Sequence, residues 1–214
     1  MRSALQKARE APSSTKARIL ATAEEVFAAK GFAGASTREI AAKAGVNISS
    51  LHYHWESKET LYFAVFQNIY DRILDLVRTS IPEKLVGSKA GRAVVETSMG
   101  TLFDYFADHP NVPKLLVRRL LENDEGEAAI ERDILVPAWT TFGQWMQEHS
   151  GRRLSESESH LFMLTIYGVV LVYLLDSRHF TTLLGGSVYD AAVREQVRAY
   201  IINLVPTLLG QSLK

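Results

Sequence analysis

The chain has 214 residues, 47% of them hydrophobic and 22% charged, and its 24 basic and 24 acidic side chains leave no net charge. This is the composition of a globular protein with enough apolar material for a core, so disorder of the whole chain is excluded. Zero net charge argues against a protein that coats nucleic acid indiscriminately. The absence of cysteine excludes disulfides, thiolate metal sites and thiol nucleophiles, and it is compatible with a reducing cytoplasm.

Basic residues are slightly concentrated towards the N-terminus. Residues 1–60 carry nine Lys and Arg against six Asp and Glu, an excess of three that the rest of the chain balances. The first 14 residues lack helical periodicity but include Arg2, Lys7 and Arg9, and we expect a flexible N-terminal arm there. This charge distribution favours a DNA-facing head with a neutral-to-acidic body behind it.

A helix is predicted from residue 15 to residue 30, where apolar side chains recur at intervals of three and four. Ser14 or Thr15 can cap its start. Gly31 can end it, because glycine adopts the left-handed conformation that often follows a helix. Phe32 comes directly after that glycine and is expected to fold back as a hydrophobic plug.

Residues 36–58, STREIAAKAGVNISSLHYHWESK, carry the signals of two short helices joined by a tight turn. Ser36 and Glu39 have the spacing of a capping box at the start of the first helix. Gly45 suits the residue that ends this helix, and Asn47 is a strong N-cap for the next one. So short a turn forces a sharp angle between the helices, and we interpret the stretch as a helix-turn-helix.

The remainder of the chain is predicted to be helical, with no strand pattern, internal repeat or low-complexity tract. Pro137 should kink or divide one helix, and Ser155 or Ser157 should cap the most apolar one. The longest apolar run, residues 161–175, falls short of the roughly 20 residues of a membrane span, so we expect a buried helix and no membrane contact. The expected helices cover residues 58–79, 92–108, 112–123, a stretch ending near 149, 155–180 and 188–209.

The sequence from Ile19 to Phe66 resembles the tetracycline-repressor (TetR) family of bacterial transcription regulators. The likeness lies in a helix ending KGF, followed by STREIAAKAGVNISSLHYHWESKETLYFAVF; beyond it, only the helical layout is similar. It implies an all-α protein with a helix-turn-helix DNA-binding domain over residues 15–60 and a helical ligand-sensing and dimerisation domain over residues 61–214. It also implies a homodimeric repressor that leaves its operator when a small molecule binds the body.

Four positions of the helix-turn-helix depart from the family pattern. His52 stands where relatives usually have tyrosine, and Trp55 where they usually have phenylalanine, although Trp55 should still fill the small core of the head. Ile48 and Ser49 stand where many relatives have lysine and glycine, which lowers the local positive charge and suggests contact with a thymine methyl group. The operator of this chain is therefore not expected to be that of its relatives.

The candidate DNA contacts divide into residues that position the protein and residues that read bases. Thr37 can offer its hydroxyl and N–H to a phosphate at a positive helix end. The resemblance implies three further positioning residues, Tyr53, His54 and Lys58. Side chains at the start and on the exposed side of the second short helix can enter the major groove, and these are Asn47, Ile48, Ser49 and His52. Each of them taken alone could equally be solvated surface.

The predicted body is rich in aromatic and other large apolar side chains that could line a ligand pocket, with polar groups such as Arg119 beside them, although core packing explains most of these side chains as well. The residues concerned are Phe103, Tyr105, Phe106, Arg119, Trp139, Phe142, Met146, Phe162 and Tyr167. Such a lining suits a small, largely apolar effector. The last two helices carry more apolar surface than one chain can cover, and pairing across a two-fold axis would bury it in a homodimer.

The sequence contains no motif of an enzyme active site or a metal site. The sequence lacks a P-loop, a nucleophile elbow and paired dinucleotide-binding glycines, so we expect neither an enzyme nor a cofactor. His52 and His54 lie two apart on a helix and point to different sides, and no third ligand is near, so no metal is expected.

The function expected from the sequence is that of a cytoplasmic transcription regulator. It would bind a pseudo-palindromic double-stranded DNA operator as a homodimer and be released by a small-molecule effector. One alternative is an activator, or a regulator controlled by a partner protein, with the same fold. The other is a helical small-molecule carrier or enzyme that does not bind DNA.

Overall fold

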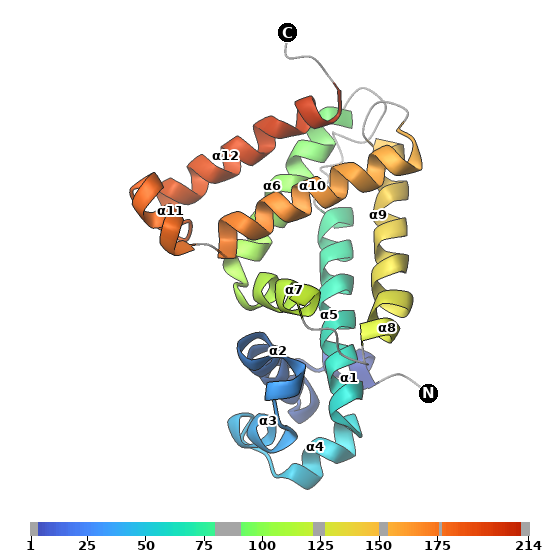
Figure 1. The fold of residues 1–214 in the computed structure, drawn as a ribbon. Helices are drawn as coiled ribbons and strands as arrows, with labels where there is room; N and C mark the ends of the chain where they lie inside the picture. Colours follow the sequence, from blue (N-terminus) through green and yellow to red (C-terminus); the bar gives the residue numbers. More distant parts are fainter. Residues whose placement is uncertain (1–3, 80–90, 122–126, 150–153, 176, 211–214) are drawn as a thin grey trace. The chain divides into compact units, whose positions relative to one another are not determined.

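The structure is a computed structural model and describes residues 4–79, 91–121, 127–149, 154–175 and 177–210. Every regular element in these ranges is a helix (Figure 1), which confirms the all-α class predicted from the sequence. The helices belong to two compact units. The division into domains at residue 60 stays a prediction, because the two units are interleaved along the chain.

Unit 1 comprises residues 1–71 and 114–135. Helix α2 packs against α1, α3 and α4. The elements of the unit are α1 (Ala4–Glu10), α2 (Thr15–Gly34), α3 (Thr37–Lys43), α4 (Ile48–Trp55), the first part of α5 (Lys58–Thr79), most of α7 (Asn111–Leu121), α8 (Glu127–Ile130) and a π-helical turn (Glu131–Leu135).

Aromatic side chains form much of the core of unit 1. The ring of Tyr62 on α5 meets those of Phe27 and Phe66 edge-on, each at 4.9 Å between centroids. Gly31 has a φ of 74°, which breaks the helical path of α2 after residue 30 as predicted. The chain then brings Phe32 back to within 4.9 Å of Tyr62, so this phenylalanine is the plug that the sequence suggested.

Helix α1 packs on the rest of unit 1 through a buried alanine, and an arginine side chain bonds it to α5. Ala8 of α1 is buried, and a guanidinium nitrogen of Arg9 lies 2.7 Å from a carboxylate oxygen of Asp71 on α5. The Nε of Arg9 also donates to the side-chain oxygen of Asn68 at 3.0 Å. The flexibility of residues 1–14 stays a prediction. Part of this range forms the helix α1 in the structure.

Unit 2 comprises residues 72–113 and 136–214. Helix α10 packs against α6, α9, α11 and α12, and α6 packs against α9 and α12. The helices of the unit are the second part of α5, α6 (Gly91–Asp108), the first residues of α7, α9 (Val136–His149), α10 (Glu156–Leu175), α11 (Ser177–Leu184) and α12 (Ala191–Leu208).

The start of α10 is fixed by a capping box. The hydroxyl of Ser155 accepts a hydrogen bond from the N–H of Glu158 at 3.2 Å, and the carboxylate of Glu158 accepts from the N–H of Ser155 at 2.8 Å. Ser155 is therefore the cap, and not Ser157. The single helix predicted over 155–180 is wrong at its end, because α10 ends at Leu175 and a separate α11 follows.

Pro137 divides its helix, as the sequence predicted. Proline cannot donate the N–H that an α-helix would bond to the carbonyl four residues earlier, and its ring crowds that carbonyl. The chain responds with the wider π-helical turn at Glu131–Leu135, between α8 and α9. This turn ends where unit 1 gives way to unit 2 in the sequence.

Helix α10 is long and apolar enough, by length and composition alone, to cross a membrane. The core helix of a soluble protein passes the same test. Seven residues of α10 are buried in unit 2, including Phe162, Ile166 and Val170. Other apolar residues of the helix, among them Leu161 and Leu164, are exposed, so α10 has an apolar inner face and an apolar outer face.

Candidate nucleic-acid interface

The turn between α3 and α4 has the hydrogen bonds of a Schellman motif. The N–H of Val46 donates to the carbonyl of Ala41 at 2.9 Å, and the N–H of Gly45 donates to that of Ala42 at 3.1 Å. Gly45 has a φ of 64°, which side chains with a Cβ rarely adopt, while open space surrounds the position of a Cβ there. Backbone conformation alone therefore requires this glycine, as the sequence predicted.

Helix α4 begins where its N-cap was expected. The side-chain oxygen of Asn47 accepts from the N–H of Ser50 at 2.7 Å. Leu51 and Trp55 lie on the inner face and are fully buried, and the indole Nε1 of Trp55 donates to the carbonyl of Lys16 at 3.3 Å. The inner face of α4 is thus fixed to α2, and the predicted role of Trp55 in the small core is confirmed.

Helix α3 is held against α2 by two ion pairs. The hydroxyl of Ser36 accepts from the N–H of Glu39 at 3.2 Å, which is one half of the predicted capping box. The other half is wrong, because the carboxylate of Glu39 pairs with the ammonium of Lys30 on α2 at 2.7 Å instead of reaching back to Ser36. Lys43 and Glu25 form the second pair at 2.8 Å. Packing of α3 on α2 brings these opposite charges within reach of each other.

The outer face of α4 carries most of the candidate DNA contacts. Ile48, Ser49, His52 and Tyr53 are exposed, Tyr53 at 84%. Residues three and four apart lie on one side of a helix, so Ile48, Ser49 and His52 share a face. Thr37 is half-buried at the first position of α3. The exposed face therefore mixes one apolar, one hydroxyl and two aromatic polar side chains.

Two other candidates have partners inside unit 1. The ammonium of Lys58 donates to the carbonyls of Phe32 at 2.8 Å and Ala35 at 3.1 Å, and it lies 4.2 Å from the centroid of the Phe32 ring. An ammonium has three N–H donors, so one remains for a further acceptor. The ring of His54 meets that of Tyr53 edge-on at 5.1 Å. Burial, and then the charge of Lys16, lower the pKa of His54.

The model of bacterial regulatory proteins of the tetR family matches residues 19–65, which contain α3, the turn and α4. This part of the chain is therefore that of a TetR-family regulator. The match classes residues 19–65 with bacterial regulatory proteins, in agreement with the prediction from the sequence. The match also covers the face of α4 that bears Ile48, Ser49 and His52, where the chain departs from the usual family residues.

Two curated relatives match about half of the chain. An uncharacterised HTH-type regulator, YerO of Bacillus subtilis, is 31% identical over 51% of the chain and 38% of its own length. The HTH-type transcriptional activator FasR of Mycolicibacterium smegmatis is 34% identical over 51% of the chain and 46% of its own length. The chain thus spans less than half the length of these relatives.

Solved structures extend the likeness in fold to nearly the whole chain. The fatty acid degradation regulator FadR of Bacillus halodurans matches 92% of this chain and 96% of its own, with a TM-score of 0.69 and 16% identity. FadR of Bacillus subtilis, solved in complex with stearoyl-CoA, matches 92% of this chain and 99% of its own, with a TM-score of 0.60 and 15% identity. At such identities the likeness establishes the fold alone.

The candidate pocket residues are divided between the two units. Eight of the nine belong to α6, α9 and α10 of unit 2, whereas Arg119 lies on the part of α7 that belongs to unit 1. Four are buried as core side chains are, namely Phe103, Phe106, Met146 and Phe162. Tyr105, Trp139, Phe142 and Tyr167 are half-buried, and the rings of Trp139 and Tyr167 meet edge-on at 5.5 Å.

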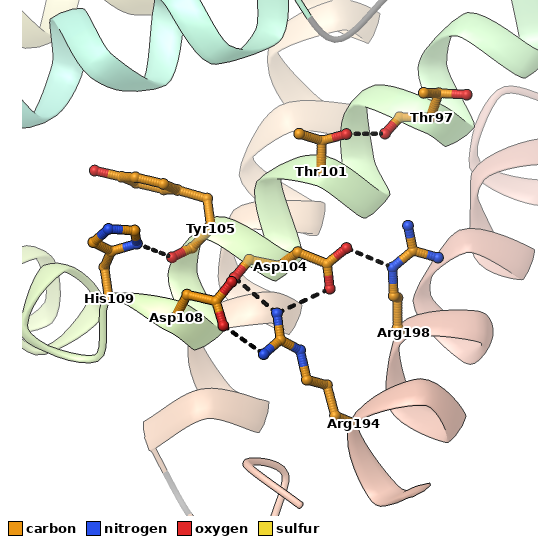
Figure 2. Close-up of polar contacts among 8 residues, drawn as sticks. All are labelled: Thr97, Thr101, Asp104, Tyr105, Asp108, His109, Arg194 and Arg198. Carbon is orange, nitrogen blue, oxygen red and sulfur yellow. Dashed lines mark hydrogen bonds and ion pairs between the residues drawn. The ribbon is translucent and has the colours of Figure 1, made fainter. Parts of the chain in front are cut away.

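A charged cluster between α6 and α12 was not foreseen from the sequence. Figure 2 shows Arg194 between Asp104 and Asp108, with nitrogen–oxygen distances of 3.2 Å and 2.6 Å to their carboxylates. Arg198 donates its Nε to the other carboxylate oxygen of Asp104 at 2.8 Å. The hydrogen bond from Arg194 lowers the pKa of Asp108. A Cβ added at Gly100 would meet Arg198 at 2.5 Å, so this glycine makes room for the guanidinium.

Metal ligands do not converge in the part of the chain that the structure describes. Within it, no group of three or more His, Cys, Asp or Glu side chains could hold a metal ion. His109 and His149 bond the backbone carbonyls of Tyr105 and Trp145, one turn earlier, each at 2.8 Å. Both histidines therefore have a structural partner at the end of their helix.

Proposed function

We propose that this chain is a cytoplasmic DNA-binding transcription regulator that places α4 in the major groove of an operator. The observation that carries the proposal is the division of α4 into a buried face, with Leu51 and Trp55, and an exposed face, with Ile48, Ser49 and His52. A helix fixed on one side and exposed on the other, at a sharp angle to the preceding helix, is the form of a recognition helix. The family match over residues 19–65 supports the same assignment.

The proposed contacts follow from the chemistry of each exposed group. Phosphate contacts come from Thr37, Tyr53, His54 and Lys58, whose donors can meet phosphate oxygens. Lys58 would use its third N–H, since the other two are bonded to backbone carbonyls. Base contacts come from Asn47, Ile48, Ser49 and His52. Because the oxygen of Asn47 caps α4, its amide NH₂ is the group available to DNA.

Binding to DNA is tested with the full chain and duplexes from upstream of its own gene. We expect band shifts whose affinity falls steeply as salt rises, because each phosphate contact releases counterions. Replacing both Tyr53→Ala and Lys58→Ala should weaken binding to all sequences alike and flatten the salt dependence. Binding retained by this double variant would overturn the assigned phosphate contacts. Failure to bind any duplex would favour a carrier or an enzyme.

We further propose a homodimer formed through α10 and α12. The outer face of α10 bears Leu161, Leu164 and Val172, which are exposed and spaced for one side of the helix. Gly168 lies between them, with open space where a Cβ would be, so a second helix could approach closely there. Tyr200 on α12 is exposed as well. A second copy is the partner whose matching face would bury this surface by two-fold symmetry.

The dimer is tested by changing charge on that face. Leu164→Arg with Val172→Arg should yield a folded monomer in sedimentation velocity, with helical content unchanged by circular dichroism. It should also lose tight operator binding, because two half-sites are held by two linked heads. The matched control is Thr140→Arg, an exposed position of α9. A double variant that remains dimeric would contradict the proposed interface. Recovery of the wild-type chain with membranes would indicate that the exposed face of α10 contacts lipid instead.

As for regulation, we propose that a small, largely apolar ligand binds among α6, α9 and α10 and releases the operator. The half-buried aromatic groups Trp139, Phe142 and Tyr167 would meet it. The regulator solved with stearoyl-CoA supports a long acyl chain as the first compound to try. A ligand of this kind acts only if it binds the DNA-incompetent state more tightly. The part of Arg119 in ligand binding stays a prediction.

Activation is the alternative outcome that a relative supports, because FasR is named an activator. The two modes differ in the effect of the ligand on operator affinity. In the repressor, stearoyl-CoA titrated into the operator complex should lower affinity, and Trp139→Ala should abolish the response while leaving affinity without ligand unchanged. Increased affinity would indicate an activator. No response to any acyl-CoA would favour control by a partner protein.

A further inference from the structure

The imidazole of His52 is tied to the end of its own helix. Its Nδ1 lies 3.0 Å from the backbone carbonyl oxygen of Glu56, and the N–H of Glu56 donates in return to the carbonyl of His52 at 2.9 Å. A carbonyl oxygen can only accept a hydrogen bond. The Nδ1 atom must therefore carry the proton, which fixes the tautomer of the ring.

The carbonyl that receives this bond has an unusual backbone conformation. Glu56 has a φ of 54° and a ψ of −61°, and among the described residues it is the one non-glycine residue with a positive φ. Such a conformation is strained for a residue with a side chain and persists only where its surroundings hold it. Here the two hydrogen bonds with His52 are part of those surroundings. The ring and the backbone turn thus hold each other in position.

In neutral imidazole, one nitrogen donates and the other accepts. With the proton held on Nδ1, the Nε2 atom of His52 carries a lone pair and cannot donate. His52 is exposed on the face of α4 that also carries Ile48 and Ser49. On the proposed function, this is the face that enters the major groove.

We propose that His52 is a specificity-determining residue that reads amino bases through Nε2 as an acceptor. The hydrogen-bond donors in the major groove are the N6 amino group of adenine and the N4 amino group of cytosine, whereas guanine and thymine present acceptors. An acceptor at this position would bond adenine or cytosine on the contacted strand. Opposite a guanine or thymine, it would face a second acceptor and be repelled.

The inference rests on the proposed function and makes a distinctive prediction about the operator. Every base pair contains one amino base and one keto base, so His52 fixes the orientation of a pair and not its A·T or G·C type. One position in each half-site should therefore accept A or C on one strand and disfavour G or T there. A single neutral hydrogen bond corresponds to a preference of about threefold to tenfold.

The tautomer is tested first, in the free protein and without DNA. Long-range ¹H–¹⁵N correlation spectra of the ¹⁵N-histidine-labelled chain distinguish the two neutral tautomers, and His52→Ala assigns the signal. In spectra recorded at about pH 8, the proton of the neutral His52 ring should be found on Nδ1. Glu56→Gly keeps the accepting carbonyl and relieves the positive φ, so it should preserve this tautomer. A ring protonated on Nε2 would overturn the proposal.

Base preference is tested by selection from random duplexes at the same pH, with the full-length chain and two variants. Wild type should enrich A or C at one position of each half-site, and His52→Ala should lose that preference while keeping the rest of the site. His52→Lys, which can only donate, should invert the preference to G or T. An unchanged preference in both variants would overturn the role of His52. Failure to enrich any sequence would overturn the proposed function, while the tautomer measurement would still report on the ring.

Discussion

The helix-turn-helix of unit 1 and the α6–α12 pair of unit 2 are held together by different kinds of contact. Bonds within a few residues fix the turn between α3 and α4 and the start of α4, as when Val46 bonds Ala41 and Asn47 caps α4. By contrast, α6 and α12 are joined by Arg194 and Arg198, which bind carboxylates 86 to 94 residues away in the sequence. We infer that the shape of the DNA-facing motif is set locally, whereas that of the body depends on its tertiary packing.

The exposed faces of the two units also differ, in the chemistry of their side chains. Helix α4 presents mostly polar groups that can hydrogen-bond, among them Ser49 and His52, whereas α10 presents Leu161, Leu164 and Val172. Groups of the first kind suit base edges and phosphates, and groups of the second kind suit another apolar surface. Substitutions on the exposed face of α4 should therefore change DNA binding without changing the proposed dimer, whereas substitutions on α10 should change the dimer and affect DNA binding only through it.

The largest effect should come from removing the anchor of the recognition helix. Trp55 is 1% exposed and bonds the carbonyl of Lys16, so Trp55→Ala should destabilise unit 1 by about 3–5 kcal/mol. Urea unfolding followed by far-ultraviolet circular dichroism measures the change. Tyr53→Ala, on the exposed side of the same helix, should alter stability by less than about 0.5 kcal/mol. Equal losses in the two variants would show that α4 has no buried face.

A substitution in the turn between α3 and α4 tests whether the backbone conformation of Gly45 is what the turn requires. Gly45 has a φ of 64° with open space around its missing side chain, so Gly45→Ala should cost about 1–2 kcal/mol through conformation alone. Gly34→Ala is the matched control, because a Cβ there makes an ordinary contact at 3.4 Å and its φ is not positive. Thermal unfolding of both variants separates the two cases. A neutral Gly45→Ala would mean that the turn tolerates another path.

The charged cluster of unit 2 provides the corresponding test of long-range contacts. Asp104→Asn removes the charge shared by Arg194 and Arg198, and we expect a loss of about 1 kcal/mol in the free energy of unfolding, since the groups are partly exposed. Asp133→Asn is the control, because that carboxylate pairs with its neighbour Arg132 at the surface and should contribute nothing measurable. Salt should reduce the difference between the variants by screening the cluster. A loss for Asp104→Asn that is insensitive to salt would indicate a packing effect instead.

Local signals explain which parts of the fold could be predicted from the sequence. Gly31, Gly45 and Asn47 act through their own backbone or side chain, and the structure has each in the expected role. Glu39 was assigned to the wrong partner because its choice between Ser36 and Lys30 depends on how α3 packs on α2. The positive φ of Glu56 carries no sequence signal of its own, because glutamate has no preference for that conformation.

The features of the body that the sequence did not predict depend on contacts between residues far apart in the chain. The sequence contains many acids and bases, and nothing local selects Arg194 as the partner of Asp104 and Asp108. The break between α10 and α11 likewise has no proline or glycine at its position to announce it. Candidate DNA contacts could be named from the capping signals of the two short helices and from the family resemblance, and they stay predictions. Candidate pocket residues could not be separated from core residues, since both are apolar at helical spacing.

The smallest expected effect is on the pH dependence of stability, and it comes from the half-buried His54. Burial, and then the charge of Lys16, lower the pKa of His54 below the ordinary 6.5, so the unfolded chain takes up a proton before the folded chain does. Stability should therefore fall as the pH drops below 6.5 and level off once the folded state is protonated too. His54→Gln should remove this component, which we expect to be under about 0.5 kcal/mol because solvent screens the group. Lys16→Gln should reduce it only in part, since burial is the larger cause. Urea unfolding of the three proteins between about pH 5 and pH 8 measures the difference, and identical profiles would assign the pH dependence of unit 1 to other groups.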